Sequence, residues 1–365
     1  MKNIFQYVFF LLILFRGLPC AAEQDASHSV SKTLFITGGA GFIGSNFLQY
    51  MFDKYPQYQF VVLDALTYAG SLENIPDHIR KSNRFSFVYA SILEEDLVDK
   101  IMSTADWVVH FAAETHVTRS IMEDHVFFET DVMGTRALMS ALVKHANKVE
   151  RFIHISTSEV YGTSEYMPMD ENHPLKPRSP YAAAKTGADR LVYAYSCTYD
   201  IPVVILRPFN NYGPCQHLEK VIPHFITSAM QNKPLTIHGH GDQKRDWIYT
   251  KDVAIAIDKA LHLQDFSKIK NQEINIGSGK ALSVLEIAQL ILKCFHLPET
   301  FLSYVADRPG QVECHISSTD KAFTLLGWTP TISIEEGLQM TVDWYRDHPS
   351  HWKKMEPDAV VSLEY

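Results

Sequence analysis

The chain has 365 residues, of which 46% are hydrophobic and 21% are charged, so it can bury a large core and is not intrinsically disordered. Its 33 lysines and arginines against 42 aspartates and glutamates give a net charge of −9, which argues against nucleic acid as the main partner. The five cysteines are scattered, with no CxxC pair and no histidine at metal-ligand spacing. Neither a disulfide framework nor a metal site is therefore expected.

The N-terminus contains an apolar stretch. It runs from Ile4 to Phe15 between Lys2 and Arg16, and the small residues Cys20-Ala-Ala22 follow it. A spanning helix takes about 20 apolar residues, so the stretch is short for a bilayer. Its pattern fits a signal peptide, a weak anchor or an extension without function. With the polar residues that follow, residues 1–30 are assigned to a leader and linker.

A strand, a glycine-rich turn and a helix open the folded part of the chain. The strand Thr33–Thr37 precedes Gly38-Gly-Ala-Gly41-Phe-Ile-Gly44, after which an amphipathic helix is expected. In a dinucleotide site, Gly38 permits the tight turn, Gly41 lets the backbone approach a pyrophosphate at the helix start, and Gly44 lets the helix pack on the sheet. The next strand ends in Asp64, whose carboxylate accepts from a ribose 2′-hydroxyl and repels a 2′-phosphate. The predicted cofactor is therefore NAD rather than NADP.

Strands and helices then alternate. Strands are predicted at 85–89, 107–111, 151–156 and 202–207, and helices at 94–102, 129–145 and 179–199. This alternation predicts an α/β fold with a doubly wound parallel sheet of the Rossmann type, whose ligands lie beyond the carboxyl ends of the strands. Residues 31–208, with 246–276 returning to them, are assigned to the NAD-binding domain. Residues 209–245 and 277–365 are assigned to a smaller C-terminal α/β domain that binds substrate.

Candidate functional residues follow the strand ends. One strand closes in His110-Phe-Ala-Ala-Glu114, where the small Ala112 lets a cofactor lie against the backbone; Phe42 and Ile43 complete the expected cofactor contacts. Another strand leads into Ser156-Thr-Ser-Glu159, and Tyr181-Ala-Ala-Ala-Lys185 opens the next helix. Residues four apart share a helical face, so the charge of Lys185 is expected to lower the pKa of the Tyr181 phenol. Thr157 can hydrogen-bond the substrate hydroxyl from which Tyr181 would take a proton. Such a pair beside a dinucleotide suits removal of an O–H proton while the cofactor takes a hydride.

Longer motifs add specificity to these short ones. They are Asp64–Asn74, Glu114–Ile121, Asn210–Pro214, Glu219–Pro223, Gly241–Trp247 and Asp307–Gly310. With them, residues 33–346 resemble the extended short-chain dehydrogenase/reductase superfamily and, within it, the dTDP-glucose 4,6-dehydratases. The resemblance implies an NAD-dependent lyase that acts on a nucleotide-diphosphate sugar and forms a homodimer.

The resemblance also implies a reaction in three steps on one retained NAD. Tyr181 and NAD oxidise C4 of the hexose to a ketone, with Thr157 and Lys185 beside them. Glu159 then removes the acidified C5 proton while water leaves C6, and the hydride returns to C6 to give a 4-keto-6-deoxy sugar. Residues implied around the sugar diphosphate are Asn211, Lys220, Arg245 and Arg308, since arginine suits phosphate geometry.

Three positions depart from the resembling family. Ser158 replaces the aspartic acid that protonates the leaving hydroxyl, and serine could only relay a proton. The Thr-Ser-Glu sequence is similar instead to GDP-mannose 4,6-dehydratases, some UDP-N-acetylhexosamine dehydratases and UDP-glucuronate decarboxylases. Ser91 stands where an aspartate often contacts adenine, and Asp131 lies in a segment with a more usual asparagine. The change at Ser158 weakens the substrate assignment, whereas the other two departures affect only cofactor contacts. A UDP-sugar decarboxylase or 4-epimerase stays open and, from another class, a catalytically silent NAD-binding protein.

The expected location follows from the substrates. NAD and nucleotide sugars are abundant in the cytosol, so a cytoplasmic enzyme is expected. The leader keeps a second option open, namely the secretory pathway or membrane association through residues 1–22.

Overall fold

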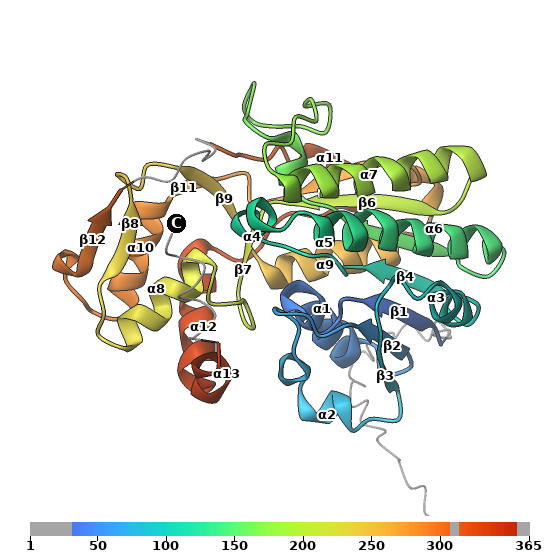
Figure 1. The fold of residues 1–365 in the computed structure, drawn as a ribbon, viewed down its shortest axis with the longest axis horizontal. Coiled ribbons are helices and arrows are strands. Elements are labelled where there is room, and N and C mark those ends of the chain that lie inside the picture. Colours follow the sequence, from blue (N-terminus) through green and yellow to red (C-terminus); the bar gives the residue numbers. More distant parts are fainter. Residues whose placement is uncertain (1–30, 307–313, 356–365) are drawn as a thin grey trace, which may run out of the picture. The chain divides into compact units, whose positions relative to one another are not determined.

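Seven parallel strands form the central sheet of the protein. The computed structural model describes residues 31–306 and 314–355, and Figure 1 shows helices covering the sheet. The strands follow the order β10, β6, β5, β4, β1, β2, β3. Their bounds are β1 Thr33–Thr37, β2 Gln59–Asp64, β3 Phe85–Tyr89, β4 Trp107–His110, β5 Arg151–Ile155, β6 Val203–Pro208 and β10 Glu273–Ile276. The order reverses between β1 and β4, which is where ligands bind in such sheets.

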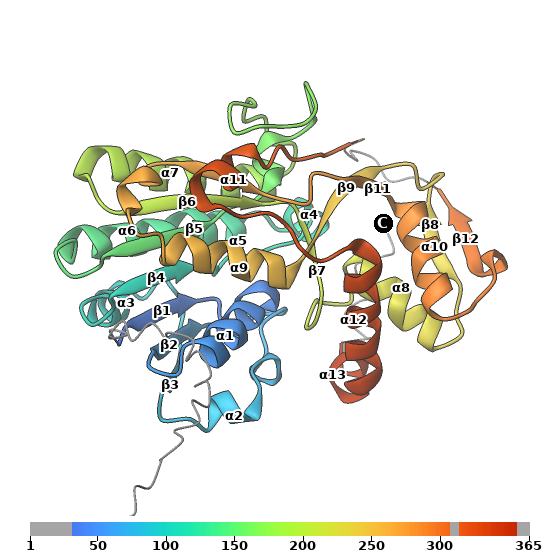
Figure 2. The same cartoon turned by 180° about the vertical axis from the view of Figure 1, so that it is seen from behind.

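Two layers of helices cover the faces of this sheet (Figures 1 and 2). On one face α1 (Phe42–Lys54) and α9 (Thr250–Leu261) share a core with the side chains of Leu34 and Ile36. On the other face α3 (Glu95–Met102), α6 (Thr135–Lys144) and α7 (Pro180–Tyr199) pack around Phe35. Because neighbouring residues of β1 are buried on opposite faces, the strand is apolar throughout. The predicted doubly wound sheet is confirmed.

Element boundaries agree with the sequence predictions to within one residue, except in one helix. The segment predicted as a helix at 129–145 begins with a π-helical stretch, Phe128–Gly134, and becomes α-helical only at Thr135. The hydroxyl of Thr135 donates to the backbone carbonyl of Asp131, so a side chain enters the helical hydrogen-bond ladder there. The wider turn carries Asp131 toward the carboxyl end of β4.

A second, smaller set of elements packs around its own core. It comprises a three-stranded sheet in the order β11, β9, β7 and a pair, β12 and β8. The bounds are β7 Asn210–Tyr212, β8 Leu235–His238, β9 Lys244–Tyr249, β11 Ala281–Ser283, β12 Leu302–Val305, α8 Val221–Met230, α10 Val284–Cys294, α12 Ile334–Asp347 and α13 Pro349–Lys353. Phe225, Ile287 and Leu338 are fully buried in this core. The smaller α/β part expected after the Rossmann sheet is present.

Short elements complete the fold. They are α2 Asp77–Arg80, α4 Val117–Met122, α5 His125–Phe127, α11 Asp320–Leu326 and the 3-10 turns Leu72–Asn74, Ser158–Tyr161, Phe266–Lys268 and Glu299–Phe301. The residues after Val30 form one unit, and the domain boundaries at 208, 245 and 276 stay a prediction. None of the helices within 31–306 and 314–355 is long and apolar enough to cross a bilayer. The predicted leader lies outside the described residues.

Candidate active site

A cavity of about 260 Å³ lies at the carboxyl ends of β1, β2 and β4. The residues that the sequence assigns to the cofactor all line it: Gly38, Gly41, Phe42, Ile43, Gly44, Asp64, Ala112, Tyr181 and Lys185. Of the predicted substrate residues, Lys220 also lines this cavity. The strand order, which reverses beside β1, therefore brings the glycine turn and the first turns of α7 to one place.

The glycine turn has the shape that a dinucleotide needs. Gly38 has a φ of +70°, and a Cβ there would lie 2.5 Å from the backbone nitrogen of Ala112. A Cβ on Gly44 would lie 2.3 Å from the carbonyl oxygen of Gly38. A Cβ on Gly41 would approach only that oxygen, at 3.3 Å. Contacts within the protein therefore constrain residue 41 less than they constrain residues 38 and 44. The space beside Gly41 faces the first N–H groups of α1, which suits a pyrophosphate.

Asp64 ends β2 with its carboxylate fixed at the cavity wall. Its Oδ2 accepts from the backbone N–H of Ala40 and its Oδ1 from that of Leu66, each at 2.8 Å. Burial raises the pKa of Asp64, and these two N–H groups oppose the rise. Each oxygen has a further lone pair for a ribose hydroxyl. Together with the glycine turn, this carboxylate fits NAD.

Tyr181 stands in the first turn of α7. Ser179 caps this helix by accepting from the N–H of Ala182 at 3.1 Å. The hydroxyl groups of Thr157 and Thr115 hydrogen-bond the Tyr181 phenol. The phenol pKa is raised, first by burial and then by the charges of Asp131 and Glu159. The structure thus brings Tyr181 together with Thr157, as the sequence predicts.

The predicted effect of Lys185 on Tyr181 is wrong for this structure. Lys185 is buried one turn along α7, but its Nζ donates to the carbonyl oxygen of Ile155 at 2.9 Å. Burial lowers the pKa of Lys185, while the charges of Asp131 and Asp189 raise it. The ammonium group is directed at β5, and burial, followed by the charges of Asp131 and Glu159, sets the direction of the phenol pKa shift.

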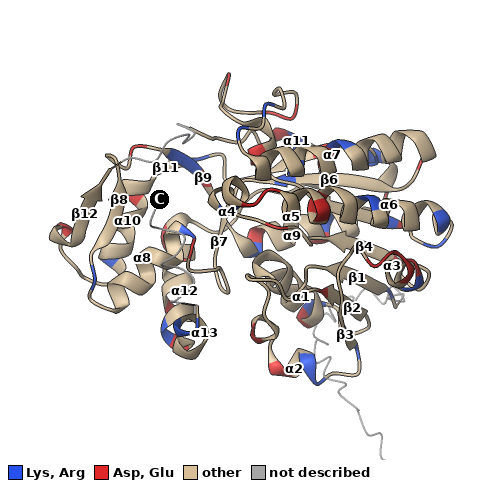
Figure 3. Cartoon of the chain, in the orientation of Figure 1, with Lys and Arg blue, Asp and Glu red and all other residues tan. Residues whose placement is uncertain are grey.

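Glu159 lies in the 3-10 turn Ser158–Tyr161, just beyond the cofactor cavity. Thr157 caps this turn by accepting from the N–H of Glu159 at 3.2 Å. The Glu159 carboxylate is near enough to Arg245 for its charge to oppose the lowering of the guanidinium pKa by burial. Figure 3 shows a basic stretch at β9, the strand that holds Arg245. The charge of Glu159 therefore acts on both Tyr181 and Arg245.

The remaining predicted site residues lie away from the cofactor cavity or outside the described part. Ser158 is buried, with 2% of its surface exposed. Asn211 donates from Nδ2 to the carbonyl oxygen of Phe209 at 2.9 Å. Neither Ser158 nor Asn211 lines the cavity. Arg308 lies outside the described residues.

Sequence reasoning missed a cluster around Glu219 at the cavity wall. The Tyr68 hydroxyl donates to Glu219 Oε1 at 2.9 Å and to the carbonyl oxygen of Thr115 at 2.6 Å. Basic groups surround the same carboxylate at 3.5–3.9 Å: His116, Arg119, His217 and Lys220. Tyr68, Thr115 and Glu219 all lie in motifs that the sequence singled out, but no spacing rule joins residues so far apart in the chain. We name His116, Arg119, His217, Glu219 and Lys220 the Glu219 cluster.

Known proteins with similar sequences include nucleotide-sugar dehydratases. A family model described as GDP-mannose 4,6-dehydratase matches residues 35–341. The low-salt glycan biosynthesis protein Agl12 of Haloferax volcanii is 42% identical over 312 residues, 86% of this chain and 98% of that protein. A dTDP-glucose 4,6-dehydratase of Streptomyces niveus is 39% identical over 333 residues, 90% of this chain and 97% of that enzyme.

Solved structures agree with the sequence comparisons. The dTDP-glucose 4,6-dehydratase of Bacillus anthracis, in complex with NAD, has a TM-score of 0.81 at 34% identity and covers 89% of this chain and 99% of its own. The Streptomyces venezuelae dTDP-glucose 4,6-dehydratase DesIV, also with NAD, reaches 0.83 at 37% identity, with 88% and 99% covered. A UDP-glucuronic acid 4-epimerase of Bacillus cereus, with NAD, reaches 0.81 at 32% identity, with 86% and 99% covered.

Proposed function

The chain belongs to the GDP-mannose 4,6-dehydratase family, and we propose that it removes water from the hexose of a nucleotide-diphosphate sugar to give a 4-keto-6-deoxy sugar. It is an NAD-dependent enzyme of the lyase class. One observation carries the proposal: Tyr181 and Thr157 are hydrogen-bonded at the cofactor cavity, with the Glu159 carboxylate close to both the phenol and Arg245. A dehydratase needs this third group because it must also break the C5–H bond.

We assign the first step to Tyr181. NAD⁺, when bound, supplies the hydride acceptor and a positive charge in the cavity. Burial, and after it the charges of Asp131 and Glu159, raises the phenol pKa; the positive charge of the cofactor would oppose this rise, and Tyr181 as tyrosinate would take the proton of the C4 hydroxyl. Thr157 orients that hydroxyl through its own hydrogen bond. Lys185 holds α7 to β5 through the Ile155 carbonyl.

We assign the elimination to Glu159. A ketone at C4 acidifies the C5 proton, which Glu159 accepts as the C–H bond breaks and the C6–O bond breaks in turn. The leaving hydroxyl needs a proton, and Ser158 is a poor acid that is buried beneath the turn. Glu159 therefore returns the same proton to the leaving hydroxyl, which departs as water, and solvent supplies the proton that C5 needs when C6 regains the hydride. Arg245 beside it limits the cost of holding a carboxylate there.

Substrate binding is assigned to the smaller part of the fold. Lys220 at the cavity wall and Arg245 next to Glu159 suit a diphosphate, and Asn211 and Arg308 keep the roles that the sequence predicts. Relatives named for dTDP-glucose and for UDP-glucose make these two nucleotide sugars the first candidate substrates. A cytoplasmic location remains a prediction.

The test is the mass of the product. Purified protein is incubated with dTDP-glucose, UDP-glucose, GDP-mannose and UDP-glucuronic acid, and the products are weighed. Loss of one water supports the proposal. An isomer of unchanged mass indicates the 4-epimerase, which the Bacillus cereus structure keeps as a second candidate. Loss of carbon dioxide indicates a decarboxylase, and bound NAD without conversion indicates a silent NAD-binding protein.

We propose that the enzyme is a homodimer. Apolar side chains are exposed on α7 and on the two elements that pack against it, α4 and the π-helical stretch: Ile121 68%, Met122 62%, Phe128 42%, Met133 48% and Tyr199 52%. An apolar surface of this kind marks an interface. Light scattering is expected to give twice the chain mass, and a monomer at micromolar concentration would contradict this assignment.

A further inference from the structure

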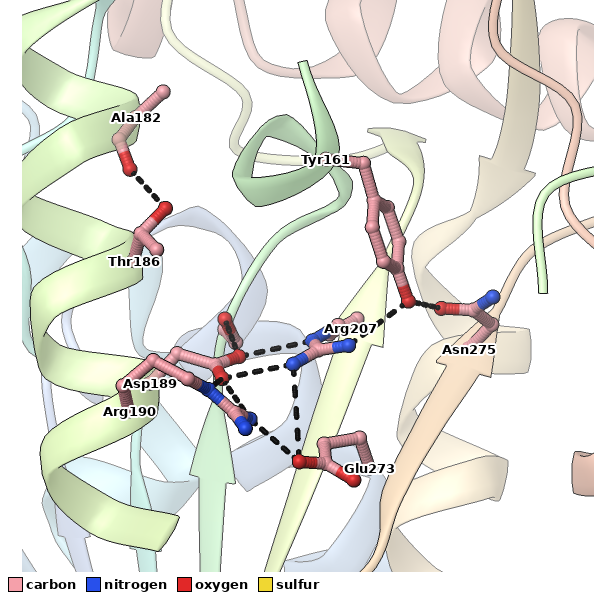
Figure 4. Close-up of polar contacts among 9 residues, drawn as sticks. Tyr161, Ala182, Thr186, Asp189, Arg190, Arg207, Glu273 and Asn275 are labelled. Atoms are coloured by element: carbon pink, nitrogen blue, oxygen red, sulfur yellow. Dashed lines mark hydrogen bonds and ion pairs between the residues drawn. The ribbon is translucent and has the colours of Figure 1, made fainter. Parts of the chain in front are cut away.

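A buried ion pair joins α7 to β6 behind the active site (Figure 4). Arg207 on β6 donates from Nε to Asp189 Oδ2 and from Nη2 to Asp189 Oδ1, both at 2.9 Å. Neither residue has more than 1% of its surface exposed. Burial opposes ionisation, but the hydrogen bonds and charge of Arg207 hold the pKa of Asp189 well below its usual range. The pair is therefore charged at neutral pH.

Two arms lead from this pair to the segment that carries Thr157 and Glu159. In the first, the Ser156 hydroxyl donates to Asp189 Oδ2 at 2.6 Å, and Ser156 directly precedes Thr157. In the second, Arg207 Nη1 donates to the Tyr161 hydroxyl at 3.1 Å. Tyr161 is the last residue of the turn that contains Glu159. The two arms thus hold both ends of the segment 156–161.

The second arm is itself anchored. The Tyr161 hydroxyl donates to Asn275 Oδ1 at 2.7 Å, and Asn275 Nδ2 donates to the carbonyl oxygen of Met169 at 3.0 Å. Tyr161 and Asn275 have no exposed surface. A side chain fixed at its hydroxyl from two sides has little freedom, so the backbone of the turn is fixed with it.

The place of Asp189 on α7 connects these arms to the phenol. Tyr181, Lys185 and Asp189 are each four residues apart, so they lie along one face of the helix. Asp189 thus marks the same face two turns beyond Tyr181. Lys185, midway, donates to the Ile155 carbonyl beside Ser156. Polar contacts therefore join the helix to Ile155 through Lys185 and to Ser156 through Asp189.

Stability alone does not explain such a pair. Buried ion pairs are often no better for stability than apolar residues of the same volume, because desolvation offsets their attraction. What they add is direction: a bidentate carboxylate–guanidinium contact has one favourable geometry. A device that sets direction belongs where small displacements matter, and displacement of a reacting group by about 1 Å can cost on the order of a hundredfold in rate.

We propose that the Asp189–Arg207 pair is the positioning device of the active site, with Ser156 setting Thr157 against Tyr181 and Tyr161 setting Glu159. This inference rests on the proposed function. Ser156, Tyr161, Asp189 and Arg207 are positioning residues, since they act through their neighbours. The two arms then control different steps: the Ser156 arm controls oxidation at C4, and the Tyr161 arm controls loss of water.

Single-turnover kinetics separate the arms. Ser156→Ala and Tyr161→Phe each remove one buried hydroxyl, and so do the matched controls Ser196→Ala, farther along α7, and Tyr58→Phe, bonded to His262. In Tyr161→Phe we expect bound NADH to form at the native rate and to accumulate, with product formation slowed about tenfold or more. In Ser156→Ala we expect NADH formation itself to slow by a similar factor. Native kinetics in both variants, or the same slowing in variants and controls, would overturn the inference.

A second measurement does not depend on turnover. Arg207→Lys keeps the charge but loses the two-pronged contact, so hydrogen exchange is expected to rise together in residues 156–162 and in the first turns of α7. Unchanged exchange in either segment would overturn the inference. Absence of any dehydrated product from the wild-type enzyme would instead refute the proposed function, whatever the exchange shows.

Discussion

Two buried carboxylates in this molecule have opposite surroundings. Asp189 accepts the bidentate contact of Arg207 at 2.9 Å and the Ser156 hydroxyl at 2.6 Å. Glu219 is as deeply buried, with 1% of its side chain exposed, yet its nearest basic group is 3.5 Å away and its Oε2 has no hydrogen bond among the described residues. Similar charge and burial thus give a tight contact in one place and a loose one in the other.

The two carboxylates therefore serve different purposes. Short, directional contacts fix the relative positions of strand and helix, and the Asp189 pair lies behind the reacting groups. His217, Glu219 and Lys220 of the Glu219 cluster line the cavity, where the Lys220 ammonium, 3.5 Å from the carboxylate, has donors that can also reach an anionic ligand. The Asp189–Arg207 pair fixes the geometry of the active site, and the Glu219 cluster provides positive charge for a ligand.

The largest effect is expected from breaking the tight pair. Arg207→Met removes the buried bidentate partner of Asp189 and leaves the half-buried Arg190 as its remaining counter-ion, so the free energy of unfolding is expected to fall by about 1.5–3 kcal/mol. Asp189→Leu combined with Arg207→Met is expected to recover most of that loss, because no unpaired charge remains. Urea unfolding measures both. A loss below about 1 kcal/mol in the single variant would mean that this pair is no tighter than a surface pair.

Asp131 is a third buried carboxylate and differs from both Asp189 and Glu219. Its Oδ1 accepts from the backbone N–H of Glu114 at 2.7 Å, and its Oδ2 has no hydrogen bond among the described residues. Burial raises the pKa of Asp131 to about 7, and the charge of Lys185 and that N–H oppose the rise. The folded protein then holds a proton that the unfolded chain has released. The free energy of unfolding is therefore expected to fall as the pH rises from about 4 to about 7, by up to about 1.4 kcal/mol per pH unit.

Asp131→Asn tests this expectation. The amide keeps an oxygen for the Glu114 N–H and has no proton to lose, so the unfolding free energy of the variant is expected to vary less over the same pH range. Lys185, Glu114 and Tyr181 interact with this carboxyl, so the difference between the two curves reports Asp131 together with its coupling to these three groups. Parallel curves would show that the carboxyl is ionised throughout.

The smallest effect is expected at the loose site. Glu219→Gln keeps an acceptor for the Tyr68 hydroxyl and removes one negative charge from a basic cluster. Stability is expected to change by about 1 kcal/mol or less, and KM for the anionic substrate to fall by about threefold, an effect that salt diminishes. Steady-state kinetics at low and high salt measure it. A fall in kcat with unchanged KM would show that Glu219 positions the reacting groups instead.

Much of the fold was predictable because its determinants are local. Apolar runs mark the strands, Ser179 and Pro180 mark the start of α7, and Gly38 to Gly44 mark the cofactor turn. The site was predictable as far as it follows strand ends and helical spacing, which bring Thr157, Tyr181 and Lys185 together. The sequence could not show that Lys185 turns to the Ile155 carbonyl, because a backbone acceptor leaves no trace in a pattern.

Other features depend on contacts between distant segments. The π-helical turn at Asp131 arises where the Thr135 hydroxyl enters the backbone ladder, although the residues read as an ordinary amphipathic helix. The pairing of Asp189 with Arg207 joins a helix to a strand, and their spacing of 18 residues in sequence carries no periodic signal. Such pairings are selected by three-dimensional packing, which one sequence does not display.

Glu159 is assigned to break the C5–H bond after Tyr181 has allowed C4 to be oxidised. The decisive experiment mixes the Glu159→Gln enzyme with dTDP-glucose or UDP-glucose in a single turnover. Enzyme-bound NADH is expected to form and to persist while no sugar loses water. Dehydrated product at the native rate would contradict it.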